Sequence, residues 1–204
     1  MFSEKGGGHR VNLNSPLGIL EGFILPSGEV AALAFDALPA RWLQEPEVKT
    51  SAAAETAAAL EEQLAAYFSG TLRRFDLPLA PRGTPFQQRI WQAISRVPYG
   101  SLTTYAGLAA EGRSPRAFRA AGTATGQNPL VIIIPCHRVL REELYHRALR
   151  HPETLTEAGN YAGGRDRKTA LLRREGVIKQ PPGFPGGVSP QIIEKRHQHR
   201  HQQG

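Results

Sequence analysis

The chain has 204 residues and a net charge of +7. This length provides a hydrophobic core for one large domain or two small ones. The single cysteine excludes an internal disulfide and a multi-cysteine zinc site, and it favours a reduced, cytoplasmic setting. We find no apolar stretch long enough to span a bilayer and no secretory signal at the start. The basic charge favours an anionic partner such as nucleic acid as much as it favours a merely basic soluble protein.

The N-terminal third predicts a strand meander followed by a helix. Residues 1–10 are glycine-rich and polar, which predicts a flexible end. Turn signals separate short apolar runs over residues 15–36, as expected for a meander of strands. Residues 51–67 are alanine-rich and contain no glycine or proline, so they predict a helix that ends at Gly70. Its buried face is predicted to hold Ala58, Leu60, Leu64, Ala65 and Phe68.

Prolines between residues 77 and 83 predict a domain boundary. We expect an N-terminal domain over 11–78, a connector over 79–83 and a C-terminal domain over 84–178. The C-terminal domain begins with strong helix-start signals, because an N-cap hydroxyl, a proline and a capping-box glutamine stand at Thr84, Pro85 and Gln87.

Two short helices are predicted next, over residues 101–111 and 114–126, with a glycine-containing turn between them. This is the outline of a helix-turn-helix, and Arg116 and Arg119 lie on its second helix. The outline alone is a weak indication of DNA binding, since many helix pairs of this kind bind nothing.

The remaining residues predict one strand, one helix and a tail. Residues 130–134 form a β-branched apolar run, which predicts a buried strand leading to Cys136. Residues 141–158 are charged without clear periodicity, and 166–175 predict a helix that Gly176 ends. From 179 to 204, proline, glycine, histidine and glutamine predict a flexible tail whose histidines are solvated rather than bound to metal.

The thiol of Cys136 lies next to a possible base, His137. A free thiol has a pKa of about 8.5, so a nucleophilic cysteine needs a base and a group that stabilises its anion. Adjacent side chains on extended backbone point apart, so a bridging water is easier than direct contact. Glu175 is the candidate carboxylate that orients the imidazole. The alternatives are a small buried cysteine, a satisfied core histidine and a surface glutamate.

The sequence Pro-Cys-His-Arg-Val at residues 135–139 resembles the active-site signature of the O6-alkylguanine-DNA alkyltransferases, also called methylated-DNA–protein-cysteine methyltransferases. Further motifs in the family's order and spacing extend the resemblance over residues 83–176. They stand at residues 86–91, 97–100, 104–105, 126–129, 160–164 and 168–176. Residues before 83 match loosely.

The resemblance implies an α+β fold of two domains. The N-terminal domain would be a ribonuclease-H-like α/β meander plus helix. The C-terminal domain would be helical, with a winged-helix-like helix-turn-helix and a short active-site strand. The implied activity is DNA repair by direct reversal: an irreversible, stoichiometric transfer of the alkyl group of O6-alkylguanine to Cys136. The sequence leaves open whether O4-alkylthymine is also a substrate. The implied partner is double-stranded DNA bound through the minor groove by a monomer, with no cofactor, metal or membrane.

Residue roles follow from the same resemblance. The implied catalytic residues are Cys136 as acceptor, His137 as base through a water, Glu175 as its orienter, Tyr105 as proton donor to guanine and Asn128 as a brace. DNA contacts are implied for Arg119, which would fill the gap left by a flipped base, and for Tyr105, Arg116, Thr104 and Ser114. The base and its alkyl group would enter a pocket formed by Pro135, Val139, Tyr161, Ala162 and Lys168.

The sequence departs from the family pattern at residues 141–158, where a longer, charged connection replaces a short glycine-containing loop. It could change the range of accepted alkyl groups, act as a lid, contact phosphates or be an inert surface excursion. Ala162 stands where some members have a serine. Three other function classes compete with repair: a non-catalytic lesion binder, a DNA-binding regulator and a cysteine hydrolase.

Overall fold

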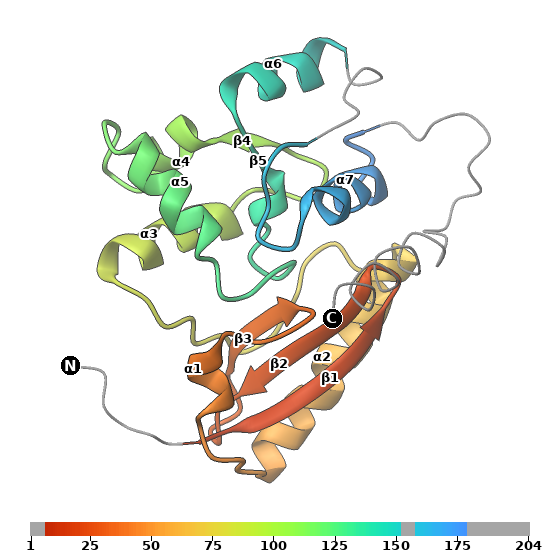
Figure 1. The fold of residues 1–204 in the computed structure, drawn as a ribbon. Helices are drawn as coiled ribbons and strands as arrows, with labels where there is room; N and C mark the ends of the chain where they lie inside the picture. Colours follow the sequence, from red (N-terminus) through yellow and green to blue (C-terminus); the bar gives the residue numbers. More distant parts are fainter. Residues whose placement is uncertain (1–6, 152–157, 179–204) are drawn as a thin grey trace, which may run out of the picture.

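The computed structural model describes residues 7–151 and 158–178 (Figure 1). The N-terminal half is the predicted antiparallel meander, in the order β1 (His9–Ser15), β2 (Gly18–Ile24) and β3 (Val30–Phe35). Gly18 has a φ of +114° at the β1–β2 turn, a conformation that favours glycine. Residues 9 and 10 pair with β2, so the prediction of a flexible end is wrong for them. Residues 1–6 and the predicted tail lie outside the described residues.

Two helices complete this half, α1 (Ala40–Leu43) and α2 (Ser51–Ser69). The predicted start and end of α2 are confirmed, because the Thr50 side chain caps it and Gly70 follows with a left-handed φ of 90°. Its buried face packs against the sheet and contains Ala53, Thr56, Leu60, Leu64 and Tyr67 (Figure 1). Ala58 and Ala65 are exposed, contrary to prediction, because the larger Tyr67 turns toward the core.

The C-terminal half begins with α3 (Pro85–Ser95), whose predicted capping box is present. The short strand β4 (Thr103–Thr104) then leads into the helix pair α4 (Tyr105–Glu111) and α5 (Phe118–Gly126). Both helices start later than predicted. For α4 the reason is local, since the Thr104 side chain caps it by accepting the N–H of Gly107. The pair packs together and against α3.

The predicted strand over residues 130–134 is wrong. This segment is buried, but it folds as a series of turns with a bridge between Leu130 and Leu33 of β3. Ile132 has a φ of +71°, which interrupts extended backbone. The segment is apolar because it fills the space between the halves, and its hydrogen bonds come from turns and from Asn128.

Cys136 therefore begins a short 3₁₀ helix, η1 (Cys136–Arg138), rather than ending a strand. The strand β5 (Val139–Leu140) follows and pairs in parallel with β4. The helices α6 (Glu142–Arg150) and α7 (Arg165–Arg174) complete the described chain.

Helix α6 corrects the reading of residues 141–158 as a segment without periodicity. Leu144, Tyr145 and Ala148 are its less exposed residues and pack on a small apolar cluster. Glutamates in its first turn and arginines in its last turn also favour the helix through its dipole. Only these three apolar residues mark the buried face of α6, and charged residues surround them in the sequence. The helical periodicity was therefore too weak to recognise.

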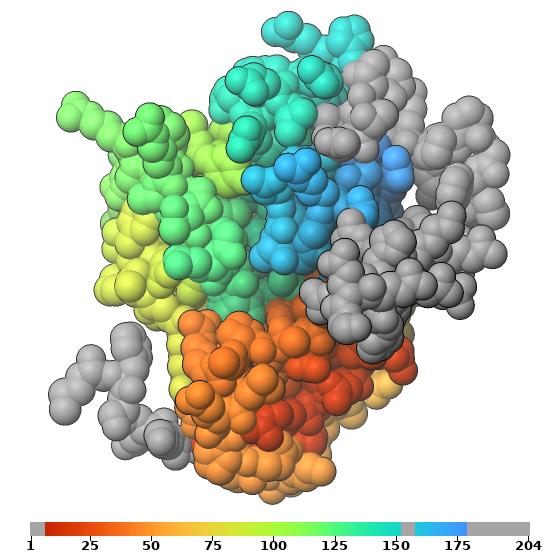
Figure 2. Space-filling view, in the orientation of Figure 1, coloured from red at the N-terminus to blue at the C-terminus, as the bar shows by residue number. Residues whose placement is uncertain are grey.

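The main hydrophobic cluster joins the two halves, which lie directly against each other in Figure 2. It combines Leu33 and Leu60 of the N-terminal half with Trp91, Ile134 and Leu171 of the C-terminal half. An ion pair crosses the same boundary, because the two terminal guanidinium nitrogens of Arg167 donate to the carboxylate of Asp36, at 2.6 and 2.8 Å. Apolar packing and an ion pair therefore both connect the second half to the first. No helix in the described ranges is both apolar and long enough to cross a bilayer.

Candidate active site

Cys136 lies at a cavity of about 330 Å³ in the C-terminal half, with 3% of its surface exposed. The cavity is lined by Tyr105, Gly122, Thr125, Gly126, Cys136, Arg141, Asn160, Tyr161 and Ala162. These residues come from the start of α4, from one side of α5 and from the loops around β5 and before α7. The sulfur is thus enclosed by protein and borders this cavity.

Asn128 fixes the sulfur in place. Its Nδ2 atom donates to Sγ of Cys136 at 2.9 Å and to the carbonyl of Ile134 at 2.7 Å. Its Oδ1 atom accepts the N–H of Leu130 at 3.0 Å. Asn128 is therefore at the turn where the sequence placed it, and it contacts the reactive atom as well.

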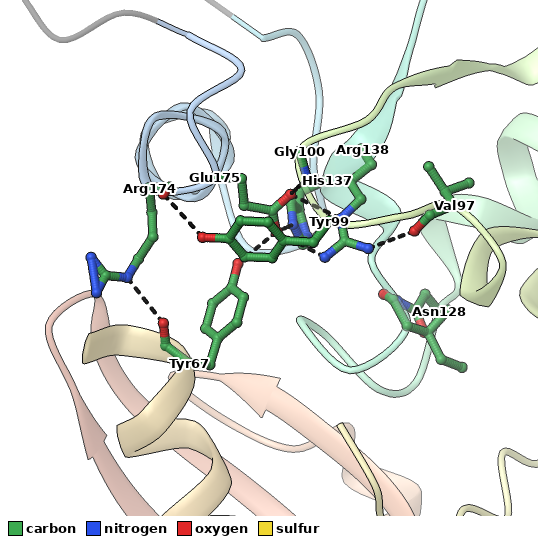
Figure 3. A network of polar contacts seen from close by, with 10 residues as sticks. Tyr67, Val97, Tyr99, Gly100, Asn128, His137, Arg138, Arg174 and Glu175 are labelled. Carbon is green, nitrogen blue, oxygen red and sulfur yellow. Dashed lines mark hydrogen bonds and ion pairs between the residues drawn. The ribbon is translucent and has the colours of Figure 1, made fainter. Parts of the chain in front are cut away.

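Behind the cysteine, His137 and Glu175 form a fully buried pair, with 2.7 Å between Nε2 and Oε1 (Figure 3). The same carboxylate accepts two hydrogen bonds from the guanidinium of Arg138, at 2.9 and 3.0 Å. It also accepts the hydroxyl of Tyr67 at 2.8 Å and the N–H of Gly100 at 3.3 Å. Of these partners, sequence reasoning anticipated only His137.

The donors around Glu175 keep it ionised. Burial alone would raise the pKa of this carboxyl, but the hydrogen bonds and charges of His137 and Arg138 outweigh burial and lower the pKa to about 2. An ionised carboxylate only accepts hydrogen bonds, so Nε2 of His137 carries the proton.

The tautomer of His137 leaves the lone pair on Nδ1, and this atom is buried without a hydrogen-bond partner among the described residues. Burial lowers the pKa of His137, so the imidazole is neutral at rest and can accept a proton.

The thiol is not ionised at rest. Burial raises the pKa of Cys136 to about 11, although the Asn128 hydrogen bond and the Lys168 charge act in the opposite direction. The sequence predicted a strand that leads to Cys136 and a group that stabilises the sulfur anion; the structure has no strand at 130–134, and the resting thiol is neutral. A neutral thiol beside a neutral imidazole must lose its proton during the reaction, not before it.

Of the five residues predicted to form the pocket, Tyr161 and Ala162 are in the described lining. Pro135 and Val139 are buried on either side of η1. Lys168 is buried on α7, where its ammonium donates to the carbonyls of Val139 and Asn160 at 2.7 and 3.2 Å. Burial lowers its pKa to about 8. Lys168 thus ties the active-site segment to the loop that carries Tyr161.

Sequence reasoning missed several lining residues. Gly122, Thr125 and Gly126 share one side of α5, and their small size at helical spacing was the available signal. Asn160 is the first residue of the motif at 160–164, and Arg141 lies two residues after the motif at 135–139, but neither was predicted to line the pocket.

The residues implied in DNA contacts surround the helix pair. Tyr105 is partly buried at the cavity, and burial raises its pKa. Arg116 and Arg119 are exposed, and the Arg119 guanidinium lies 5.7 Å from the ring centre of Phe118. Ser114 is half-buried before α5. Thr104 is buried as the cap of α4, so its contact with DNA stays a prediction. No group of three or more metal-ligating side chains gathers within residues 7–151 and 158–178.

The fold and the cysteine site define a class of protein that combines a helix pair with a buried acceptor thiol, and comparisons agree. Residues 85–177 match the family model "6-O-methylguanine DNA methyltransferase, DNA binding domain". A Mycobacterium tuberculosis methylated-DNA–protein-cysteine methyltransferase is 34% identical over 171 residues, which are 82% of this chain and 92% of the relative. A Methanosarcina barkeri protein of the same name is 41% identical over 138 residues, or 68% and 75% of the two chains.

Solved structures agree as well. The M. tuberculosis O6-methylguanine methyltransferase has a TM-score of 0.67 and 31% identity, covering 86% of this chain and 96% of that one. The M. tuberculosis OGT in complex with DNA has a TM-score of 0.67 and 33% identity, covering 83% and 94%. The chain belongs to the methylated-DNA–protein-cysteine methyltransferase family.

Proposed function

We propose that this protein repairs DNA directly, by transferring the alkyl group of O6-alkylguanine in double-stranded DNA to Sγ of Cys136. The observation that carries the proposal is the enclosed Cys136 sulfur, hydrogen-bonded to Asn128 and backed by the His137–Glu175 pair, in a member of this family. Relatives are named for the same methyl transfer, and one similar structure is a complex with DNA.

The reaction breaks the bond between the alkyl carbon and guanine O6 and forms a bond between that carbon and sulfur. The thiol proton passes through a water to the free Nδ1 of His137, and Glu175 stabilises the resulting imidazolium. Tyr105 at the cavity gives its hydroxyl proton to the departing guanine, which is a poor leaving group as an anion. The product is a thioether, which water does not cleave, so each molecule reacts once and needs no cofactor.

DNA is bound through the minor groove by the helix pair, with the nucleotide flipped out of the duplex. Flipping costs a few kcal/mol, which the exposed Arg119 offsets by filling the gap in the base stack. Arg116, Ser114 and Thr104 hold the phosphates, and this contact is largely blind to sequence. The base enters beside Tyr161 and Ala162, with Pro135, Val139 and Lys168 supporting the wall.

The protein acts as a cytoplasmic monomer of two domains, over 11–78 and 84–178. The meander with α2 supports a ribonuclease-H-like N-terminal domain, and the α4–α5 pair supports a winged-helix-like C-terminal domain. Acceptance of O4-alkylthymine is compatible with the same chemistry, since its alkyl group is also carried on an exocyclic oxygen.

Intact mass spectrometry tests the proposal. After incubation with duplex DNA that contains O6-methylguanine, the protein should gain one methyl group, and Cys136→Ala should gain none. An unchanged mass for the folded, reduced protein rejects alkyl transfer. In that event, tight binding to the lesion identifies a lesion binder, binding that ignores the lesion identifies a regulator, and multiple turnovers of an ester without DNA identify a hydrolase.

A further inference from the structure

One oxygen of Glu175, Oε1, accepts hydrogen bonds from both halves of the molecule, and the Arg138 guanidinium is a third donor to it at 3.0 Å. Oε1 accepts the Nε2–H of His137 at 2.7 Å and the hydroxyl of Tyr67 at 2.8 Å (Figure 3). Tyr67 lies on α2, 108 residues before Glu175, and is 1% exposed. The N-terminal half thus reaches the carboxylate that orients the proposed base.

Hydrogen bonds to an ionised carboxylate stabilise the ionised form and make it less basic. A less basic carboxylate pulls less strongly on the Nε2 proton and gives less stabilisation to a protonated imidazole. The hydroxyl of Tyr67 therefore acts on His137 through Glu175, without contact between the two rings.

We propose that Tyr67 is a positioning residue of the alkyl-transfer site: its hydroxyl aims the Glu175 carboxylate at His137 and limits how strongly that carboxylate holds the imidazole proton. The inference rests on the proposed function, because this limit matters when His137 takes up the thiol proton. It assigns the N-terminal half a part in tuning the site in addition to its structural role.

Other charged and titratable groups face the pair and stay in place when Tyr67 is changed. Arg138 on η1 holds both carboxylate oxygens, and Lys168 on α7 acts on His137 by its charge. Tyr161 lies edge-on to the His137 ring at 6.3 Å between centroids. Tyr99 follows α3 and donates its hydroxyl to the carbonyl of Arg174 at 3.1 Å, and not to Glu175.

The test is Tyr67→Phe, which removes the hydroxyl and keeps the ring. NMR titration of the His137 side chain in the full-length protein should show a pKa above that of the parent. The rate of transfer from free O6-benzylguanine, measured against pH, should fall on the acidic side as His137 becomes protonated. This acidic limb of the pH–rate profile should move to higher pH by the same amount as the His137 pKa. Transfer should slow about two- to fivefold on the acidic side of that limb and should equal or exceed the parent on the alkaline side. The matched control is Tyr99→Phe, which should leave the limb in place.

A uniformly slower reaction with an unmoved limb would mean that Tyr67 is merely structural, and it would overturn the proposal. A second variant protects the test against misfolding: 3-fluorotyrosine at position 67 is a stronger donor and should move the limb to lower pH. In a Glu175→Gln background, Tyr67→Phe should not move the His137 titration. If the parent takes no alkyl group, the proposed function fails, while the NMR titration still decides the coupling between Tyr67 and His137.

Discussion

Asn128 and Cys136 are joined by a 2.9 Å hydrogen bond from the amide nitrogen to the sulfur. The same amide satisfies the backbone of the turn that carries the chain from α5 to the cysteine. A single side chain therefore fixes the reactive atom and the segment that presents it.

We expect Asn128→Ala to destabilise the fold and to slow alkyl transfer. The change leaves the N–H of Leu130 buried without its partner, at a cost of about 1–3 kcal/mol. It also removes one of the two donors to the carbonyl of Ile134, which keeps the N–H of Cys136. It also raises the pKa of Cys136 further, because the Asn128 hydrogen bond acts to lower it. Urea unfolding and the rate with free O6-benzylguanine measure the two effects. The exposed neighbour Gln127, changed to alanine, is the control, and parent-like stability of Asn128→Ala would contradict the bracing role.

Glu175 predicts a specific dependence of stability on acid. Its pKa of about 2 in the folded protein lies below the ordinary value of 4.5, so its contribution is fully present above the ordinary value. Because the unfolded chain binds the proton first as the pH falls, this contribution is lost between about pH 4.5 and 2. The unfolding free energy of the parent should fall as the pH is lowered through this range. In Glu175→Gln this fall should be smaller by a few kcal/mol. Parallel curves for parent and variant would show that the carboxylate is not the source.

The same variant should slow alkyl transfer and retain DNA binding, because Glu175 contacts His137 and lies away from the exposed face of the helix pair. Stopped-flow transfer and fluorescence anisotropy on undamaged duplex separate the two properties. A Glu175→Gln protein that reacts at the parental rate would remove Glu175 from the proposed tuning of His137.

Arg119→Ala should slow transfer from duplex DNA by about tenfold or more, since one lost contribution of 1.4 kcal/mol to flipping is a factor of ten. Transfer from free O6-benzylguanine should be unchanged, because a free base needs no flipping. The comparison is Arg116→Ala, which should weaken duplex binding without a specific effect on base flipping. The slope of the log binding constant against log salt concentration should become smaller by about 1. Equal slowing of Arg119→Ala with both substrates would contradict the wedge role.

Arg141→Ala should slow transfer from the free base and from duplex alike, by roughly two- to tenfold. Arg141 lines the cavity, and its charge acts to lower the pKa of Tyr105 against the effect of burial. Its removal makes Tyr105 a poorer proton donor. Arg147→Ala, on the exposed part of α6, is the control and should react as the parent does. A loss confined to duplex substrate would instead assign Arg141 to phosphate binding.

Local chemistry allowed several elements to be predicted from the sequence. The capping box of α3 and the end of α2 at Gly70 depend on residues within one turn of each other. The importance of Cys136, His137 and Glu175 followed from the motifs that carry the family resemblance. The prediction of a strand over 130–134 was wrong. An apolar run indicates that a segment is buried, but it does not determine the backbone conformation of that segment.

The sequence by itself predicted which groups react, because the proposed acceptor cysteine, the candidate base and its carboxylate stand in motifs of fixed spacing. The tertiary structure alone decided the state of those groups. Packing removed water from Cys136 and raised its pKa, and it gathered Tyr67, Arg138 and Gly100 around Glu175 from three distant segments. Desolvation and long-range hydrogen bonds depend on which surfaces meet, and a linear order of residues does not specify that.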